Sequence, residues 1–333
     1  MDTDCPSVFI RVYPYPSVVN PPAIAVIDIG SNSIKLLVAA RDAGGNLQAL
    51  LQQTLDVRIS AGLGRERPRL GEEGIARGLA AIQELIAAAG SHSPAQTILV
   101  ATSAVRGAEN GADFCARVLA TTGQAVRILA GAEEANLIGR GLLCDPALVD
   151  FQDFYVFDLG GGSLECLTFR QRRIEQELSL ALGCVRLTER FIPDPAAPIT
   201  AAATTALALH VRDELKKSGF RFNLGSAGAV FTGGSMTSVR AINGAMHGVA
   251  LADTPPVVSA DTLAALVEEV LPLTLGQRQN IPGLPAARAD VFPAALITML
   301  TVAEYGLISH FHHSLHNLRW GVAAEAMRED PHV

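Results

Sequence analysis

Two short polar turns in the sequence have the residue types that bind phosphate. Each follows an apolar run and has the pattern Asp-x-Gly-x-x-Ser, at Asp28–Ser33 and at Asp158–Ser163. Glycine and small polar residues let consecutive backbone N–H groups approach an anion, and a serine hydroxyl adds a donor. A tight hairpin that needs glycine for its backbone conformation is the alternative. Duplication of the aspartate favours phosphate binding, with expected contacts from Gly30, Ser31, Asn32, Ser33, Gly160, Gly161, Gly162 and Ser163.

Acidic side chains beside these turns suit a divalent cation. Asp158 and Glu165 are seven residues apart, on the two arms of one expected hairpin. Mg²⁺ prefers a few oxygen ligands together with water and substrate phosphates. We therefore expect these two carboxylates to bind Mg²⁺, with Asp28 as a third ligand. Glu165 could instead be a strand residue without function, but a carboxylate in an apolar run is costly without a partner.

An arginine and two glutamates have positions that fit phosphoryl chemistry. Arg106 follows a buried strand, at the end of the sheet where open α/β folds bind ligands. Its guanidinium could neutralise phosphoryl charge, although an arginine after a strand is also common on the solvated surface. Glu133 and Glu134 begin an expected helix, and there the helix dipole alone is enough to favour acidic residues.

Two further clusters allow more than one interpretation. Gly233, Gly234 and Ser235 form a glycine turn between an expected strand and helix, and could contact substrate or, in a kinase, lie against an adenosine. The histidines His310, His312, His313 and His316 are spaced closely enough to ligate a transition metal. No carboxylate or cysteine is interleaved with them, so we favour no metal site there.

The elements around these residues have the pattern of a duplicated α/β chain. AIAVIDIGSNSIKLLVAA from Ala23 and YVFDLGGGSLECLTF from Tyr155 each predict a strand, a tight turn and a strand, and a shift of 130 residues aligns them. Apolar runs predict further strands over 98–105 and from 230. Helical spacing predicts helices over 72–89, 112–122, 133–143, 199–218 (N-cap Thr200, stop Gly219), 261–275, 290–305 and 316–328.

This pattern predicts two domains of α/β class. We expect a disordered lead over residues 1–22, a first domain over 23–130 and a second over 131–313. A cleft between two domains is where small ligands are usually held.

Charge and composition exclude several classes of partner. A net charge of -7 argues against a nucleic-acid or anionic-membrane surface. The five cysteines are an odd number without a CxxC pair, which indicates reduced thiols in the cytosol. No apolar run reaches the roughly 18 residues of a membrane span, and prolines interrupt the N-terminal segment. We expect a soluble, cytoplasmic protein.

The ordered motifs resemble those of the exopolyphosphatase/guanosine pentaphosphate phosphohydrolase (Ppx/GppA phosphatase) family. They span about Ala23 to Met327 and comprise VIDIGSNSIKLLV, VATSAVRGAEN, ILAGAEEANLIGRG, VFDLGGGSLECLTF, LALGCVRLTERF, FTGGSMTSVRAI, RADVFPAALI and LHNLRWGV. The resemblance implies two ribonuclease-H-like domains of the actin, sugar kinase and Hsp70 type, with the active site in the cleft between them. It also implies that the C-terminal helix, within 314–333, completes the first domain.

The resemblance implies roles for individual residues. Glu134 matches the glutamate of the GxEEA motif that acts on the attacking water. Arg106 and Asn110 match the arginine and asparagine of the TxxxRxAxN motif, and Asp158 and Glu165 the acids of DxGGGSxE.

Three departures from the family pattern stand out. Leu164 replaces a threonine after the GGGS serine, and Trp320 replaces the glutamate of the LREG motif, while Arg319 remains. The chain also ends where longer relatives carry a further helical domain, which leaves processivity open.

Together these features predict Mg²⁺-dependent hydrolysis of a terminal phosphoanhydride, in inorganic polyphosphate or guanosine pentaphosphate. An ATP-dependent kinase of the same fold is one alternative, and a non-catalytic sensor of polyphosphate or an alarmone is another. Relatives often pair, so a homodimer is compatible with the resemblance.

Overall fold

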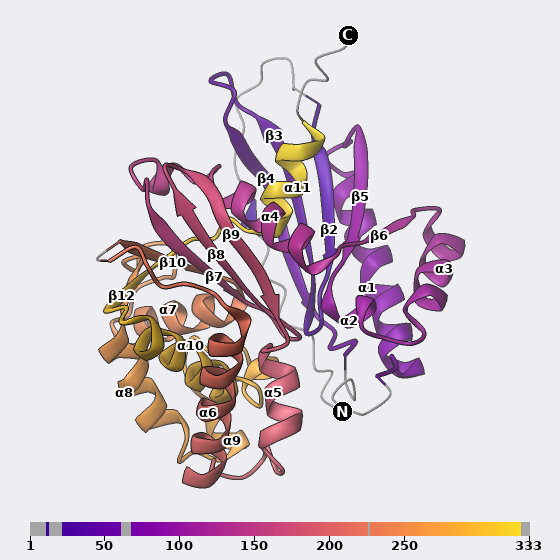
Figure 1. The fold of residues 1–333 in the computed structure, drawn as a ribbon. Coiled ribbons are helices and arrows are strands. Elements are labelled where there is room, and N and C mark those ends of the chain that lie inside the picture. The colour runs from indigo at the N-terminus through magenta and orange to yellow at the C-terminus, as the bar shows by residue number, and fades with distance from the viewer. Residues whose placement is uncertain (1–10, 13–21, 61–67, 226, 328–333) are drawn as a thin grey trace. The chain divides into compact units, whose positions relative to one another are not determined.

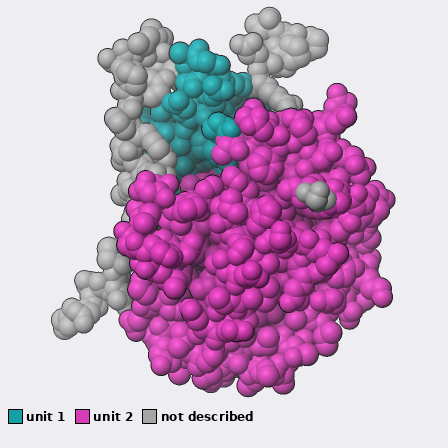
Figure 2. All heavy atoms as spheres, turned by 90° about the vertical axis from the view of Figure 1, so that its left-hand side faces the viewer, with its two compact units in different colours: residues 1–146, 316–333 teal, residues 147–315 magenta. Residues whose placement is uncertain are grey.

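The computed structural model describes residues 11–12, 22–60, 68–225 and 227–327. The chain divides into two compact units (Figures 1 and 2). Unit 1 comprises the residues up to Pro146 and those from His316, and unit 2 comprises Ala147–Leu315. The expected disordered lead lies almost entirely outside the described residues, but Arg11–Val12 within it forms a strand.

Unit 1 is built on a mixed sheet with the order β1-β4-β3-β2-β5-β6. The strands β2, β3 and β4 form an antiparallel meander, and β5 and β6 continue the sheet parallel to β2. The strands are β1 (Arg11–Val12), β2 (Ile24–Ile29), β3 (Ser33–Arg41), β4 (Leu47–Asp56), β5 (Gln96–Ala101) and β6 (Val126–Ile128).

Helices cover both faces of this sheet. Alternate residues of β2 point to opposite faces, and Ala25, Ile27 and Ile29 pack with α1 and α3 in one apolar core. On the other face α11 contacts β2 and β3 and packs along α4 (Figure 1). The helices of unit 1 are α1 (Glu72–Gly90), α2 (Ser103–Arg106), α3 (Gly111–Thr122), α4 (Gly131–Leu142) and α11 (Leu318–Ala326).

The packing of α4 moves the domain boundary from its expected place. The division expected from the sequence lies after residue 130, whereas the structure divides the chain after Pro146. The reason is that α4 packs closely along α11, at positions where Gly141 and Gly321 have no side chain. Both helices therefore belong to unit 1.

Unit 2 contains a second mixed sheet with the order β11-β12-β10-β7-β8-β9. The strands β7, β8 and β9 are an antiparallel meander, and β10 and β12 follow parallel to β7. The strands are β7 (Phe154–Leu159), β8 (Leu164–Arg170), β9 (Arg173–Leu180), β10 (Gly228–Thr232), β11 (Val257–Ser259) and β12 (His310–His313).

The helices of unit 2 share one large apolar core with one face of the sheet. Tyr155, Phe157 and Leu159 of β7 belong to that core. The helices are α5 (Cys184–Phe191), α6 (Ala201–Ser218), α7 (Gly234–Met246), α8 (Ala260–Val270), α9 (Leu275–Arg278) and α10 (Phe292–Gly306), with 3₁₀ turns η1 (Pro146–Leu148) and η2 (Ala286–Arg288). The predicted N-cap and stop of α6 are confirmed, because Thr200 accepts a hydrogen bond from Ala203 N and Gly219 is left-handed. The helix begins at Ala201 rather than at residue 199.

The two sheets repeat one topology. In each, an antiparallel meander of three strands is extended by two strands parallel to the first. This is the ribonuclease-H-like arrangement, so the predicted α/β class with two such domains is confirmed. Within the described ranges, every helix is too short or too polar to cross a lipid bilayer.

Candidate active site

The glycine turn of unit 2 connects β7 to β8 and directs its carbonyl groups toward α5. Gly160 N–H donates to Ser163 O at 3.0 Å. The carbonyls of Gly160 and Gly161 accept from Cys184 N and Val185 N at 3.0 and 2.9 Å. Because the C=O and N–H of one peptide point in opposite directions, the N–H groups of Gly161 and Gly162 point away from α5. No acceptor within the described residues takes either of them, so both can donate to an anion.

Two residues of the segment around α5 hold this turn in place. A side chain on Gly183 would come within 2.3 Å of the Gly162 backbone, so only glycine allows α5 to begin here. Arg186 N–H donates to Gly161 O, and its Nε donates to Gly162 O at 3.1 Å. The turn is therefore fixed from the side opposite its free N–H groups.

The glycine turn of unit 1 repeats this construction. Gly30 N–H donates to Ser33 O at 3.2 Å. The Asn32 carbonyl accepts from the backbone N–H groups of Val57 and Arg58. The Asn32 side chain is also occupied, because its Oδ1 accepts from Arg58 Nε at 3.2 Å. The Asn32 amide oxygen is thus already engaged within the protein, and the phosphate contacts predicted for this turn stay a prediction.

A pair of carboxylates lies at the foot of the unit 2 turn. Asp158 and Glu165 are directly opposite each other on β7 and β8, so both point to the same face of the sheet. This is the face away from the helical core. Glu165 is buried, and its Oε1 accepts from Ser179 Oγ at 2.8 Å. Gly233, with φ +94°, packs so close to Asp158 that a Cβ would approach Oδ1 to 2.3 Å.

The corresponding pair in unit 1 has different chemistry. Asp28 is opposite Lys35 on β3 rather than opposite an acid. Burial raises the pKa of Asp28, while the charges of Lys35 and Arg319 act to lower it. Its Oδ1 is buried without a hydrogen-bond partner among the described residues. Two neighbouring cations make this a poorer cation site than the carboxylate pair of unit 2, so a metal-binding role for Asp28 stays a prediction.

Arg106 and Glu134 form a mostly buried ion pair in unit 1. Arg106 Nη1 donates to Glu134 Oε2 at 2.8 Å and to Leu129 O at 2.6 Å. The Glu134 side chain is 7% exposed and that of Arg106 is 27% exposed. The predicted strand over 98–105 ends at Ala101, and Arg106 is the last residue of the short helix α2. Both described bonds use Nη1, so the other guanidinium N–H groups remain available to phosphoryl oxygens.

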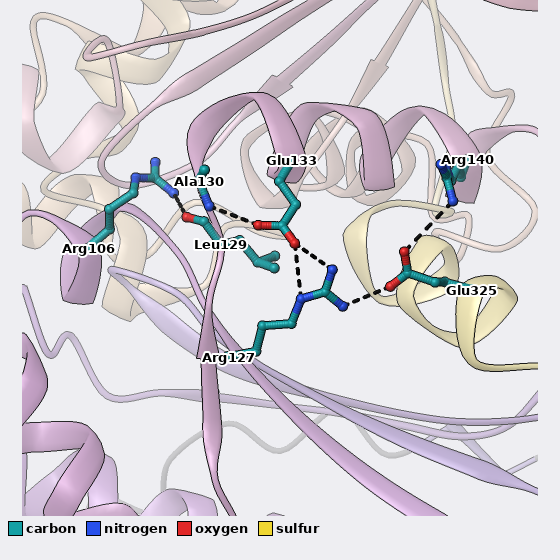
Figure 3. Close-up of polar contacts among 7 residues, drawn as sticks. All are labelled: Arg106, Arg127, Leu129, Ala130, Glu133, Arg140 and Glu325. Carbon is teal, nitrogen blue, oxygen red and sulfur yellow. Dashed lines mark hydrogen bonds and ion pairs between the residues drawn. The ribbon is translucent and has the colours of Figure 1, made fainter.

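Glu133, next to Glu134, has a structural role (Figure 3). It accepts from Ala130 N at 3.1 Å and pairs with Arg127 at 2.5 Å. Arg127 also pairs with Glu325 of α11 at 2.8 Å (Figure 3). The first turn of α4 is thereby fixed, with one acid on the exposed side and Glu134 buried against Arg106.

A model of the Ppx/GppA phosphatase family matches residues 37–330. The chain belongs to the Ppx/GppA phosphatase family. The family resemblance inferred from the motifs is thereby confirmed, and the chain is a phosphatase.

Solved structures agree with this fold. An exopolyphosphatase from Cytophaga hutchinsonii is 22% identical, with a TM-score of 0.83, and the match covers 91% of this chain and 97% of that one. The Aquifex aeolicus member of the Ppx/GppA family is 23% identical, with a TM-score of 0.74 and coverage of 93% and 99%. An exopolyphosphatase-like protein is 23% identical, with a TM-score of 0.82 and coverage of 92% and 97%.

Asn110 has a structural role in this Ppx/GppA phosphatase. Its Oδ1 accepts from Leu70 N at 2.8 Å, and its Nδ2 donates to Leu70 O at 2.9 Å. The amide is buried and fixes the segment before α1. Both ends of the side chain are thus occupied, and the predicted substrate contact of Asn110 stays a prediction.

The histidine cluster is divided between different surroundings. His310 is exposed on β12, whereas His313 is buried and bonded to Arg240 and Thr237. His316 belongs to unit 1, where its Nδ1 is 3.4 Å from Asp145 Oδ2 and its ring lies tilted against Trp320. Among the residues that the structure describes, no three His, Cys, Asp or Glu side chains form a metal-binding group.

Several residues that support the site were not among those predicted from the sequence. Gly183 and Arg186 belong to the quoted motif LALGCVRLTERF, so the signal was present without an assigned role. Arg288 lies against Gly234, where a Cβ would approach its guanidinium to 2.3 Å. Arg288 belongs to the motif RADVFPAALI. The contacts of Gly183 with Gly162 and of Arg288 with Gly234 cannot be predicted from sequence spacing, because each joins segments that are distant in the chain.

Proposed function

We propose that this Ppx/GppA phosphatase hydrolyses the terminal phosphoanhydride of inorganic polyphosphate or guanosine pentaphosphate in a Mg²⁺-dependent reaction. The buried pair of Arg106 and Glu134 is the observation that carries the proposal. A buried carboxylate beside a guanidinium with available N–H groups combines a proton acceptor with a donor for phosphoryl oxygens. The proposal has further support from similar solved structures, among them the exopolyphosphatase of Cytophaga hutchinsonii.

In the proposed reaction a water molecule attacks the terminal phosphorus in line with the departing phosphate oxygen. The new P–O bond forms as the anhydride P–O bond breaks, which leaves orthophosphate and a substrate shorter by one phosphate. Glu134 accepts the proton of the water, and Arg106 offsets the charge on the transferring phosphoryl group. The free N–H groups of the glycine turns bind phosphate oxygens.

Asp158 and Glu165 are the residues that would bind Mg²⁺. Their opposite positions on β7 and β8 bring two carboxylates to one face of the sheet, and a magnesium ion with only one or two carboxylate ligands completes its shell with water and substrate phosphates. The donor set thus fits the ion. Bound Mg²⁺ would offset the negative charge of the phosphates.

The decisive experiment measures orthophosphate release with Mg²⁺ from long-chain polyphosphate, guanosine pentaphosphate and ATP in parallel. We expect Glu134→Gln to lower kcat by roughly 10²–10⁴-fold, the usual contribution of a general base. Glu133→Gln is the matched control, because it removes a charge from the adjacent residue that only caps α4 and pairs with Arg127. Its kcat should stay within about threefold of the wild-type value.

Each outcome has a clear meaning for the proposal. Release from polyphosphate alone makes the protein an exopolyphosphatase, and preference for the guanosine nucleotide makes it an alarmone phosphatase. Near-normal turnover of Glu134→Gln would remove Glu134 from the mechanism. Binding without turnover on all three substrates would replace the enzyme with a sensor.

A further inference from the structure

A buried arginine in unit 2 is surrounded by neutral acceptors. Arg240 of α7 is 5% exposed, and burial lowers its pKa. Its Nε and Nη2 donate to the carbonyls of Pro255, Leu251 and Thr254. Its Nη1 is 3.0 Å from Nδ1 of His313, which is itself 3% exposed. No carboxylate within the described residues forms an ion pair with Arg240.

These contacts determine the proton positions in the His313 ring. A guanidinium can only donate, so Nδ1 must be the unprotonated acceptor. The neutral ring then carries its proton on Nε2, which is 3.2 Å from Thr237 Oγ1. Thr237 Oγ1 accepts a hydrogen bond from this Nε2–H and donates one to Gly233 O at 2.9 Å. The hydrogen bonds therefore run in one direction, from Arg240 through His313 and Thr237 to Gly233.

Gly233 is the residue on which this chain of hydrogen bonds ends. It follows β10, whose last residue Thr232 is opposite Asp158 on β7. Its φ of +94° is open to glycine alone, and a Cβ at this position would come within 2.3 Å of Asp158 Oδ1. The position of the Gly233 peptide therefore limits where the Asp158 carboxylate can lie.

The contact with the ring distinguishes Thr237 from other helical threonines. Thr298 and Thr301 of α10 also donate to the carbonyl four residues earlier, each at 2.7 Å. Such a bond forms readily within any helix. Thr237 differs because a buried ring with a fixed proton also donates to its oxygen. That second bond orients the hydroxyl proton toward Gly233.

We propose that His313 and Thr237 are positioning residues that set the geometry of Asp158 through the Gly233 peptide. The inference rests on the proposed function, in which Asp158 is a Mg²⁺ ligand. Neither residue contacts the metal or the substrate in this scheme. They affect the affinity for Mg²⁺, as residues that orient a metal ligand without contacting the metal usually do.

Two pairs of variants separate positioning from simple support of the fold. Thr237→Val removes the hydroxyl at constant size, and Thr237→Ser restores it. His313→Asn keeps an acceptor where Nδ1 meets Arg240 but has no donor that reaches Thr237. His313→Gln keeps a donor near the Nε2 position and loses the acceptor for Arg240.

The measurement is the rise of Tm with Mg²⁺ and the Mg²⁺ affinity by calorimetry, together with the Tm in EDTA and the Mg²⁺ dependence of phosphate release. We expect Thr237→Val and His313→Asn to weaken Mg²⁺ binding by about tenfold or more, with only a modest fall of the Tm in EDTA from the buried hydrogen bond that each variant loses. Thr237→Ser should stay within about threefold of wild type. His313→Gln should have a larger fall of the Tm in EDTA than Thr237→Val and His313→Asn, because Arg240 loses an acceptor. Its Mg²⁺ affinity should be nearly normal.

Unchanged Mg²⁺ binding by Thr237→Val and His313→Asn would overturn the inference while leaving the proposed function intact. The inference would also be overturned if, in all four variants, the loss of Mg²⁺ affinity were proportional to the fall of the Tm in EDTA. If the wild-type protein itself shows neither Mg²⁺ binding nor turnover, the proposed function fails, and the inference that depends on it fails as well.

Discussion

At the scale of single residues, Asp28 shows how one duplicated position acquired a different environment in each unit. Both aspartates precede a glycine turn, but Asp158 is opposite an acid, whereas Asp28 is opposite Lys35 and near Arg319. Its Oδ1 has no hydrogen-bond partner among the described residues. A buried polar atom without a partner lowers the free energy of unfolding.

The raised pKa of Asp28 gives a prediction about stability and pH in the metal-free protein. A carboxyl whose pKa is higher in the folded than in the unfolded state stabilises the fold fully below the unfolded pKa of 3.8 and loses that contribution as pH rises through the folded pKa. In EDTA at pH 8, we expect Asp28→Asn to be more stable than wild type by roughly 1–2 kcal/mol. The difference should vanish below about pH 4. Urea unfolding across this pH range measures both.

Addition of Mg²⁺ to the same proteins tests whether Asp28 is a metal ligand. The cations beside Asp28 compete with a metal, so we expect Mg²⁺ to raise the Tm of wild type and of Asp28→Asn equally. Asp158→Asn should lose most of that rise. A Mg²⁺ effect that disappears with Asp28→Asn would make Asp28 a ligand after all, and a pH-independent difference in stability would contradict the role of its charge.

The sequence indicated most of the reactive residues but could not separate neighbours with different surroundings. The motifs alone point to Asp158, Glu165, Arg106 and Glu134. From sequence, the helix dipole explains Glu133 and Glu134 equally well. Only the structure shows that Glu133 pairs with Arg127 and Glu134 with Arg106. The orienting contacts of Arg186 and His313 could not be foreseen, because they depend on which elements lie side by side.

At the scale of elements, the crossing of α4 and α11 depends on two glycines. A Cβ on Gly321 would come within 1.8 Å of Leu137 O, and one on Gly141 within 2.1 Å of Asn317 O. Both contacts are with backbone, which cannot move aside as a flexible side chain can. The two helices therefore approach more closely than a residue other than glycine at either position would allow.

This close approach predicts that Gly321→Ala destabilises unit 1 by about 3 kcal/mol, because overpacking of this kind forces the backbone apart. Gly90→Ala, at the end of α1, is the matched control because nothing lies within 4 Å of its Cβ position. Alanine there should leave stability unchanged or increase it by up to about 1 kcal/mol. Denaturant unfolding measures the free energy of unfolding of the two variants. Equal values would show that α4 and α11 can move apart at little cost.

Local patterns predicted some elements well and others not at all. The two hairpins and the helices α1, α3 and α6 have strong apolar periodicity or capping residues, and they lie within one or two residues of their predicted bounds. The strands β9 and β12 and the short helix α5 were missed. β9 does alternate, with Ile174, Leu178 and Leu180 on one face, so its signal was present in the sequence. β12 carries three histidines and lacks such alternation.

At the scale of the whole molecule, unit 1 is discontinuous in sequence. The chain leaves it after Pro146 and returns at His316. The family resemblance suggested that the C-terminal helix belongs with the first domain, but the placement of α4 followed only from its packing against that helix. A boundary set by contacts between distant segments is not visible in composition or local periodicity.

The discontinuity predicts that the fold of unit 1 depends on its last helix. α11 buries Leu318, Trp320 and Val322 against α4 and the sheet. Each such side chain contributes roughly 1.5–3 kcal/mol when buried, and a domain is stable by only about 5–15 kcal/mol in total. A chain that ends at Leu315 should therefore lose the cooperative fold of unit 1, while unit 2, which has its own core, stays folded.

Hydrogen exchange measures this outcome strand by strand. In the shortened chain we expect the amides of β2 and β3 to exchange rapidly, whereas those of β7 and β8 keep the protection they have in the full chain and serve as the internal control. Retained protection in β2 and β3 would show that α4 and the sheet are stable without α11. Loss of protection in all four strands would show instead that the two units unfold as one.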